Sequence, residues 1–160
     1  MKSRMSVIKF RWLLVIALVA ALLGWLVTVL ANRAGLPTPV LPYSALITLA
    51  LVIVLVVILG VRVRRWRNGN HEKDLSPILA ARTLILAQAS AYAGAIILGW
   101  HFGALVDALT TTFYGASISV LGAPVALMLG SLAMVAAGII VERFCRIPPE
   151  DGADSAAGSA

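Results

Sequence analysis

The feature that most constrains this chain is an apolar run of 23 residues from Leu84 to Val106, which contains no Asp, Glu, Lys or Arg. As a helix rising about 1.5 Å per residue, the run would extend roughly 34 Å, enough to cross a hydrocarbon core of about 30 Å. Small residues recur at every fourth position, and small residues let a second helix backbone come close. They form a predicted packing ridge made of Ala87, Ala91, Ala95, Gly99 and Gly103. The run therefore predicts a transmembrane helix with one face used as an interface.

The composition extends this interpretation to the whole chain. Of the 160 residues, 61% are hydrophobic and 12% are charged, and the mean hydropathy is +0.97. Soluble domains are nearer to half apolar and a quarter charged. We expect an all-α membrane protein with a single four-helix transmembrane domain over residues 1–147 and a disordered cytoplasmic tail over 148–160. The expected spans are residues 12–31, 43–61, 83–106 and 120–142.

Apolar length, prolines and turn residues place the boundaries of these spans. The first run has about twenty apolar residues, more than the roughly 7 to 15 of a signal peptide, so we interpret it as a retained span. Three prolines in residues 32–42 oppose a helix and predict a short extended connection. Ser76-Pro77 is typical of a helix start and predicts the beginning of the third helix. Pro124 leaves two alternatives for the fourth helix, which either kinks or begins there.

The side chains of each span predict its place in the bundle. The second span has a bulky aliphatic centre, LVIVLVVIL, which suits lipid, so we expect it at the periphery. The fourth span repeats the four-residue spacing of small residues, and we expect it to pair with the ridge of the third. Its small residues are Gly122, Ala126, Gly130 and Gly138. The first span is expected to join them through Ala17, Ala20, Gly24 and Thr28.

The distribution of basic residues predicts the orientation. Every Lys and Arg except Arg33 lies in the N-terminal segment, in the connection 62–82 or in the C-terminal segment. By the positive-inside rule these segments are cytoplasmic, which gives an antiparallel up-down bundle, N-in and C-in, in the inner membrane. The net charge of +6 sits beside membrane spans, so we expect a lipid bilayer with anionic headgroups, and no nucleic acid, as partner. The predicted headgroup contacts are Arg62, Arg64, Arg65 and Arg67.

Few polar side chains lie within the spans. His101 is flanked by two aromatic residues and has two interpretations. It is a functional group, as a proton relay or a metal ligand, or it is an interfacial histidine beside a Trp anchor. We favour the interfacial histidine because no second His, Cys or carboxylate lies at the spacing of a metal-binding site. Gln88 and Tyr92 are one helical turn apart and either line a polar cavity or bond a neighbouring helix; we favour helix bonding. Together these three residues are the predicted polar core.

Two further features lie at the predicted cytoplasmic boundary. Glu142 ends the fourth span, where the helix dipole disfavours a carboxylate, so a cation should lie nearby. Arg82 begins the third span at the same level, and we predict an ion pair between them, with two separately solvated ends as the alternative. The single cysteine, Cys145, is interpreted as an inert small hydrophobe, because no partner thiol or catalytic histidine accompanies it.

Two segments carry a family resemblance. With AARTLILAQASAYAGA at 80–95 and ERFCRIPP at 142–149, the chain resembles the actinobacterial four-helix membrane proteins grouped as domain of unknown function 3180. The likeness extends from the basic N-terminus to Pro149. It implies the same four-span topology and a plasma-membrane location, and it carries over no activity and no catalytic residue.

The sequence favours one function and leaves two others open. We expect a non-enzymatic scaffold or accessory subunit, without a cofactor, bound to a membrane-protein partner or a second copy, because neither an exposed catalytic domain nor a buried acidic residue is evident. A small oligomeric transporter or channel is the first alternative, although no carboxylate lies in a span centre. A lipid-modifying enzyme is the second, and it would use Arg82, Glu142 and Cys145 with the 62–82 connection.

Overall fold

The computed structural model describes residues 10–67, 77–115 and 117–145, and within them the chain is helical with no strand. The elements are α1 (Phe10–Arg33), α2 (Ser44–Arg67), α3 (Pro77–Phe113), the short 3-10 helix η1 (Ile118–Leu121) and α4 (Gly122–Cys145). Each of the four α-helices is long and apolar enough to cross a membrane. The expected all-α architecture with four membrane-length helices is therefore confirmed and indicates a multi-pass membrane protein.

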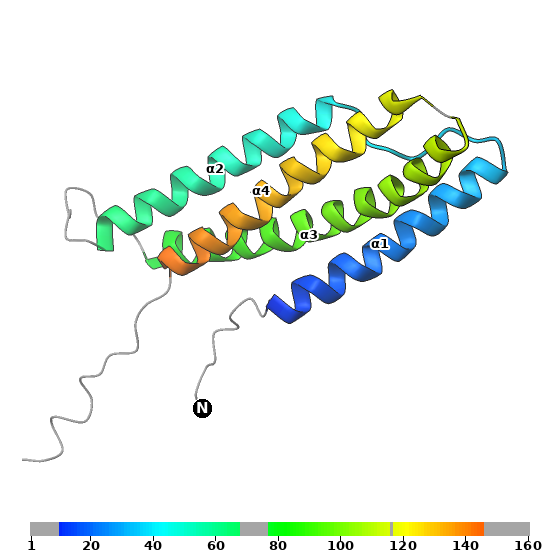
Figure 1. Cartoon of the computed structure of the whole chain (residues 1–160). Coiled ribbons are helices and arrows are strands. Elements are labelled where there is room, and N and C mark those ends of the chain that lie inside the picture. The colour runs from blue at the N-terminus through cyan, green and yellow to red at the C-terminus, as the bar shows by residue number, and fades with distance from the viewer. Residues whose placement is uncertain (1–9, 68–76, 116, 146–160) are drawn as a thin grey trace, which may run out of the picture.

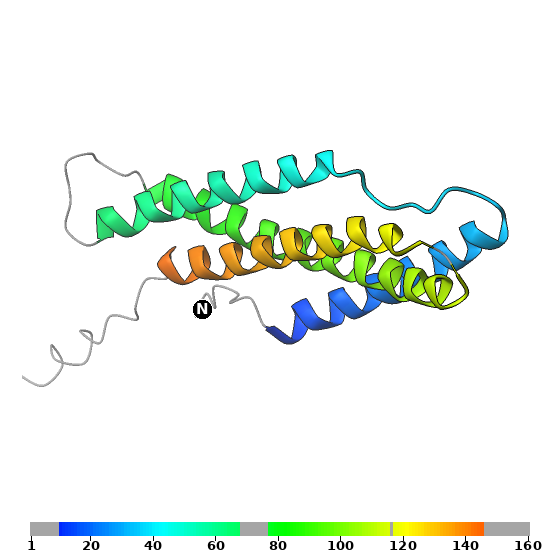
Figure 2. The same cartoon turned by 45° about the horizontal axis from the view of Figure 1, so that its top comes forward.

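The four helices lie side by side in the order α1, α3, α4, α2 (Figure 1). The turned view keeps α3 and α4 in the middle, with α1 along α3 and α2 along α4 (Figure 2). The bulky α2 lies at one edge, as its aliphatic centre predicts, and α1 lies at the other. Helices adjacent in sequence are thus not always adjacent in space, and the two middle helices carry most of the core.

The contact between α1 and α3 is backbone against backbone. A Cβ added at Gly24 would lie 2.5 Å from the carbonyl oxygen of Trp100, and one added at Gly99 would collide with the carbonyl of Ala17. Gly103 faces Ala21 in the same way. The prediction that α1 joins the bundle through its small residues is confirmed. The partner of Gly99 and Gly103, however, is α1 and not the expected α4.

The contact between α3 and α4 uses the other half of the predicted ridge. A Cβ at Gly138 would lie 2.7 Å from the carbonyl oxygen of Ala87 and 2.9 Å from Cβ of Ala91. Four residues at 100° each make 400°, so the ridge rotates by about 40° per step and by about 160° between Ala87 and Gly103. The ridge therefore winds from the face toward α4 to the face toward α1.

The small residues of α4 also have more than one partner. Gly130 faces the side chains of Leu46 and Leu49 on α2, and Gly122 faces the Tyr43 hydroxyl. Ala126 is half-buried. The spacing of these residues on α4 therefore serves α2 as well as α3.

Local sequence explains where two helices begin and end. α1 ends at Arg33, and the chain turns at Gly35, whose φ of 67° is readily adopted only by glycine. Leu36 N–H then donates to the carbonyl of Ala31, a closing bond typical of helix C-termini. α4 begins at Gly122, so Pro124 falls in its first turn, where no N–H is required. α4 therefore begins two residues before Pro124, directly after η1, and not at Pro124 itself.

Candidate functional site

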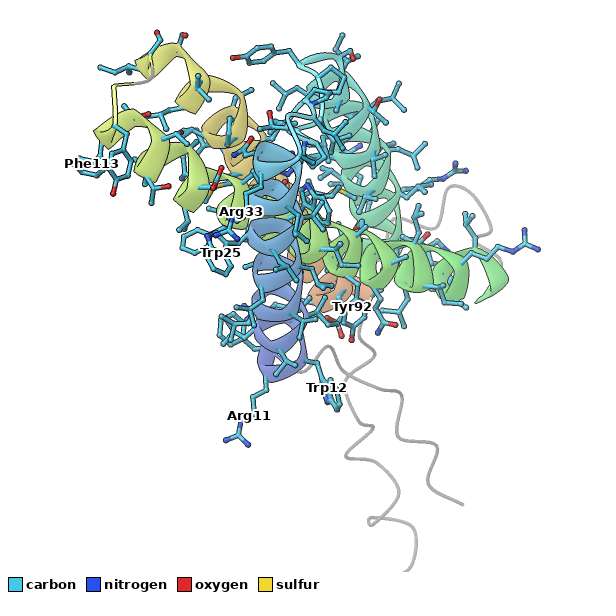
Figure 3. All side chains as sticks on the ribbon, turned by 90° about the vertical axis from the view of Figure 1, so that its right-hand side faces the viewer. Arg11, Trp12, Trp25, Arg33, Tyr92 and Phe113 are labelled. Carbon is cyan, nitrogen blue, oxygen red and sulfur yellow. The ribbon has the colours of Figure 1, made fainter. Side chains whose placement is uncertain are left out.

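A cavity of about 500 Å³, mainly apolar but with several polar groups in its lining, is found at the end of the bundle where α1 and α3 finish and α2 and α4 begin, here called the Asp107 end. Figure 3 views the protein from this end, with Arg33 and Phe113 marking the ends of α1 and α3. The cavity is lined by Thr28, Asn32, Thr38, Val40, Tyr43, Ala104, Asp107, Ala108, Thr111, Ser119, Val120, Ala123 and Pro124. Asn32, Thr38, Tyr43, Ser119 and Val120 are exposed. They are the lining residues that solvent can reach.

Asp107 is the one ionisable group deep in this cavity. Its side chain is 8% exposed, and its Oδ2 accepts a hydrogen bond of 2.5 Å from Nδ2 of Asn32 on α1. Within the described part of the chain, the Asp107 carboxylate makes no ion pair. A buried carboxylate is costly unless it is paired or solvated, and the cavity beside Asp107 is the space from which a further partner can reach it.

The hydroxyl groups near Asp107 are oriented by their own helices. Thr28 donates its hydroxyl proton to the carbonyl of Gly24 at 2.7 Å, and Thr111 donates to the carbonyl of Ala108 at 2.9 Å. A hydroxyl whose proton is used in this way offers only oxygen lone pairs to a third group. Together with Asp107, these two side chains form a cluster of hydrogen-bond acceptors.

This site was not predicted from the sequence, because the third span was expected to end at residue 106. α3 continues six residues beyond Asp107 to Phe113, so the carboxylate lies within the helix rather than in a loop. The expectation that no acidic residue is buried was wrong, since Asp107 is 8% and Glu142 is 5% exposed. The available signal was the i, i+4 pair Asp107 and Thr111, matched by Thr28 and Asn32 on the other helix.

His101 lies away from this cavity and is completely buried. Its Nδ1 is 2.8 Å from the carbonyl oxygen of Ile97, while Nε2 has no hydrogen-bond partner within the described residues. His101 borders a smaller cavity of about 310 Å³ with Pro39, Leu41 and Ile97 among its apolar lining. The adjacent Trp100 donates from Nε1 to the carbonyl of Pro39 at 3.1 Å.

The other members of the predicted polar core, Gln88 and Tyr92, do not line this smaller cavity. Tyr92 packs against the cluster formed by Leu13, Ala91 and Ala95, beside α1, and Figure 3 shows it on that side. Nine residues separate Tyr92 from His101, which places them on opposite faces of α3. Gln88 is half-buried one turn before Tyr92.

The opposite end of the bundle holds the remaining predicted residues. Glu142 is buried and Arg82 is exposed, and the ion pair between them stays a prediction. Arg62, Arg64 and Arg65 are exposed, whereas the side chain of Arg67 is outside the described structure. Cys145 is half-buried.

One contact at this end was not predicted. The guanidinium carbon of Arg64 lies 4.6 Å from the centre of the Phe144 ring, a cation–π contact that joins the ends of α2 and α4. Among the residues that the structure describes, no group of three or more His, Cys, Asp or Glu side chains is arranged to hold a metal ion.

Comparison with known protein families gives one match over most of the chain. The family described as "Protein of unknown function (DUF3180)" matches residues 13–149. The chain belongs to this family. The match covers all four helices and confirms the resemblance carried by the segments at 80–95 and 142–149. No curated protein and no solved structure matches the chain.

Proposed function

We propose that this DUF3180 protein is a non-enzymatic scaffold or accessory subunit of a membrane complex. The observation that supports this proposal is the hydrogen bonding of the buried hydroxyl groups. Among the described residues, each buried Ser or Thr hydroxyl donates to a backbone carbonyl of its own helix. Thr83 donates to the carbonyl of Leu79 at 2.8 Å, and Ser131 donates to that of Leu127 at 2.5 Å. Thr28 and Ser90 do the same. Polar groups that are satisfied locally build a fixed core, whereas a solute path needs polar groups that face the path.

The close backbone contacts support the same proposal. Carbonyl groups of Trp100 and Ala17 lie against Gly24 and Gly99, so α1 and α3 cannot slide past each other without opening the contact. A rigid bundle of this kind leaves the outer faces of α1 and α2 for lipid or for a partner. Large aliphatic side chains cover these faces, including Leu22 at 67% and Leu51 at 65% exposure.

We further infer an antiparallel up-down arrangement in the plasma membrane, with both termini cytoplasmic. The residue numbers in the contacts support the arrangement: Gly94 approaches Val135, whereas Ala87 approaches Gly138, so the numbers rise on α3 as they fall on α4. The basic residues support the orientation, because Arg33, the last residue of α1, is the one Lys or Arg of the sequence at the end where α1 and α3 finish. In this orientation the exposed Arg62, Arg64 and Arg65 lie at the cytoplasmic surface, where anionic headgroups attract them.

A small oligomeric transporter is a second candidate because the buried Asp107 carboxylate borders a cavity. Ionisable groups that face the interior of a membrane helix bundle commonly mark ion and solute pathways. The two candidates differ in what copurifies with the protein. A subunit brings one protein partner in fixed ratio, whereas a transporter is isolated as copies of itself.

The test is isolation of the tagged protein from its native membrane in mild detergent, followed by mass spectrometry. A photo-crosslinking amino acid at Leu22 on α1, or at Leu51 on α2, should join the outer face to a stoichiometric partner. The matched control is the same amino acid at Leu127, which is 0% exposed and should not crosslink to another chain. A chain that crosslinks only to copies of itself, with no other protein in fixed ratio, contradicts the subunit proposal and favours the transporter.

A further inference from the structure

The cavity at the Asp107 end combines one buried carboxylate with a mainly apolar lining that also carries several hydroxyl groups. Among the described residues, the carboxylate has one hydrogen-bond partner, Asn32, and the Thr28 and Thr111 hydroxyls offer lone pairs because their protons are used within their own helices. An anion would find no ion-pair partner from the described residues inside this cavity. A cation that carries N–H donors would pair with the carboxylate, and the Thr28 and Thr111 oxygens of the same lining can accept hydrogen bonds from such a group.

The size and lining narrow the class of cation. A volume of about 500 Å³ is far larger than a bare metal ion needs, and a single carboxylate balances a single positive charge. Ala104, Ala108, Val40 and Pro124 supply an apolar wall beside the polar groups. We infer that this cavity binds the primary ammonium group of a small organic cation, with the ammonium at Asp107 and the carbon chain against the apolar wall.

The depth of the cavity allows two sources of this ammonium group. α3 has 37 residues and extends roughly 55 Å, well beyond a hydrocarbon core of about 30 Å. Asp107 lies six residues, or about 9 Å, from its end; with α3 centred on the hydrocarbon core, this position is at the level of the lipid headgroups. The ammonium group can therefore come from a free amine or from the headgroup of an aminophospholipid.

In the experiment, n-butylammonium chloride is titrated into the full-length protein in phosphatidylglycerol nanodiscs. The heat of binding is measured by isothermal titration calorimetry, and the heat recorded with empty discs is subtracted. Saturable binding of one cation per chain is expected. The variant D107N, which keeps the shape and an amide that can pair with Asn32, should weaken binding by at least about tenfold, because hydrogen bonds to charged groups are the strongest ones lost. Equal binding by D107N and the unchanged protein, or no saturable binding, would overturn the inference.

A second pair of variants separates a loss of binding from a loss of structure. Thr111 and Thr112 both donate to the carbonyl of Ala108, at 2.9 and 2.8 Å, but of the two only Thr111 lines the cavity. T111V should weaken binding by about two- to tenfold and T112V should not change it. Equal effects of the two variants would overturn the inference, because both lose the same bond within the helix.

A last arm identifies the source of the ammonium group. Nanodiscs that contain phosphatidylethanolamine present that group from the lipid. Weaker binding of n-butylammonium in these discs, with the lipid retained by the unchanged protein and lost from D107N, supports a lipid headgroup as the ligand. Unchanged binding supports a free amine. Both outcomes require Asp107 and are distinct from the result of the crosslinking experiment.

Discussion

Asn32, at the end of α1, donates a hydrogen bond of 2.5 Å to the carboxylate of Asp107, which lies 75 residues further along the chain on α3. The bond joins an edge helix to a middle helix at the point where the cavity begins. Below it, the two helices are held by backbone contacts at Gly24 and Gly99. The Asn32 to Asp107 bond is thus the polar end of an otherwise apolar interface.

Replacing Asn32 by alanine should lower the free energy of unfolding by about 1.5 kcal/mol. This is the lower end of the range for a hydrogen bond to a charged group, because Asn32 itself is exposed. Equilibrium unfolding in mixed detergent micelles measures the loss. The control is N32A combined with D107N, in which no buried charge loses its donor, so the cost of N32A should be smaller in that background. An equal cost in both backgrounds would contradict a role for this bond.

The glycines of α3 and α4 should respond differently to an added methyl group. G99A places Cβ against the carbonyl of Ala17, which is backbone and cannot move aside, so a loss of about 1 to 3 kcal/mol in stability is expected. G130A places Cβ 3.1 Å from a terminal methyl of Leu46, which can rotate. Because alanine is better than glycine in a helix by about 1 kcal/mol, G130A should be neutral or stabilising. Equal losses, measured by the same unfolding assay, would disagree with the observed packing.

Replacing the buried His101 by leucine should raise stability by about 1 kcal/mol. The change removes a buried nitrogen that has no partner within the described residues, a group that costs about 1 to 3 kcal/mol, and loses one hydrogen bond to Ile97 worth about 1 kcal/mol. The melting temperature in detergent should therefore increase. A clear decrease would show that Nε2 has a partner in the membrane-embedded protein, such as an ordered water or a bound molecule.

The contact between Arg64 and Phe144 should contribute a small and specific coupling. A double-mutant cycle with R64A and F144L should give a coupling free energy of about 0.5 to 1 kcal/mol, as expected for a cation–π contact at an exposed site. Arg65 is the matched control, because it is exposed and next in sequence. The same cycle with R65A should give a coupling near zero, and an equal coupling would attribute the effect to general charge rather than to stacking.

The sequence predicted the helices of this fold better than it predicted which helices pack against each other. Apolar length determined four helices, and Pro77 marked the start of α3 correctly. The ridge of small residues on α3 was also real, but its partners were not predictable from spacing alone. A four-residue repeat rotates around a helix, so Ala87 faces α4 while Gly99 faces α1, and the arrangement of all three helices decides where one partner gives way to the other.

The candidate site likewise separates properties that local sequence predicts from those that helix packing decides. Composition along the chain determined that the protein is apolar, helical and long enough to cross a membrane, because those properties depend on local residues. The burial of Asp107 depends on Asn32, Thr28 and the connection after α1, which reach it only when α1 packs against α3. Tertiary structure therefore decided which polar residue is buried in a cavity, since side chains far apart in sequence share one volume only after the helices have packed.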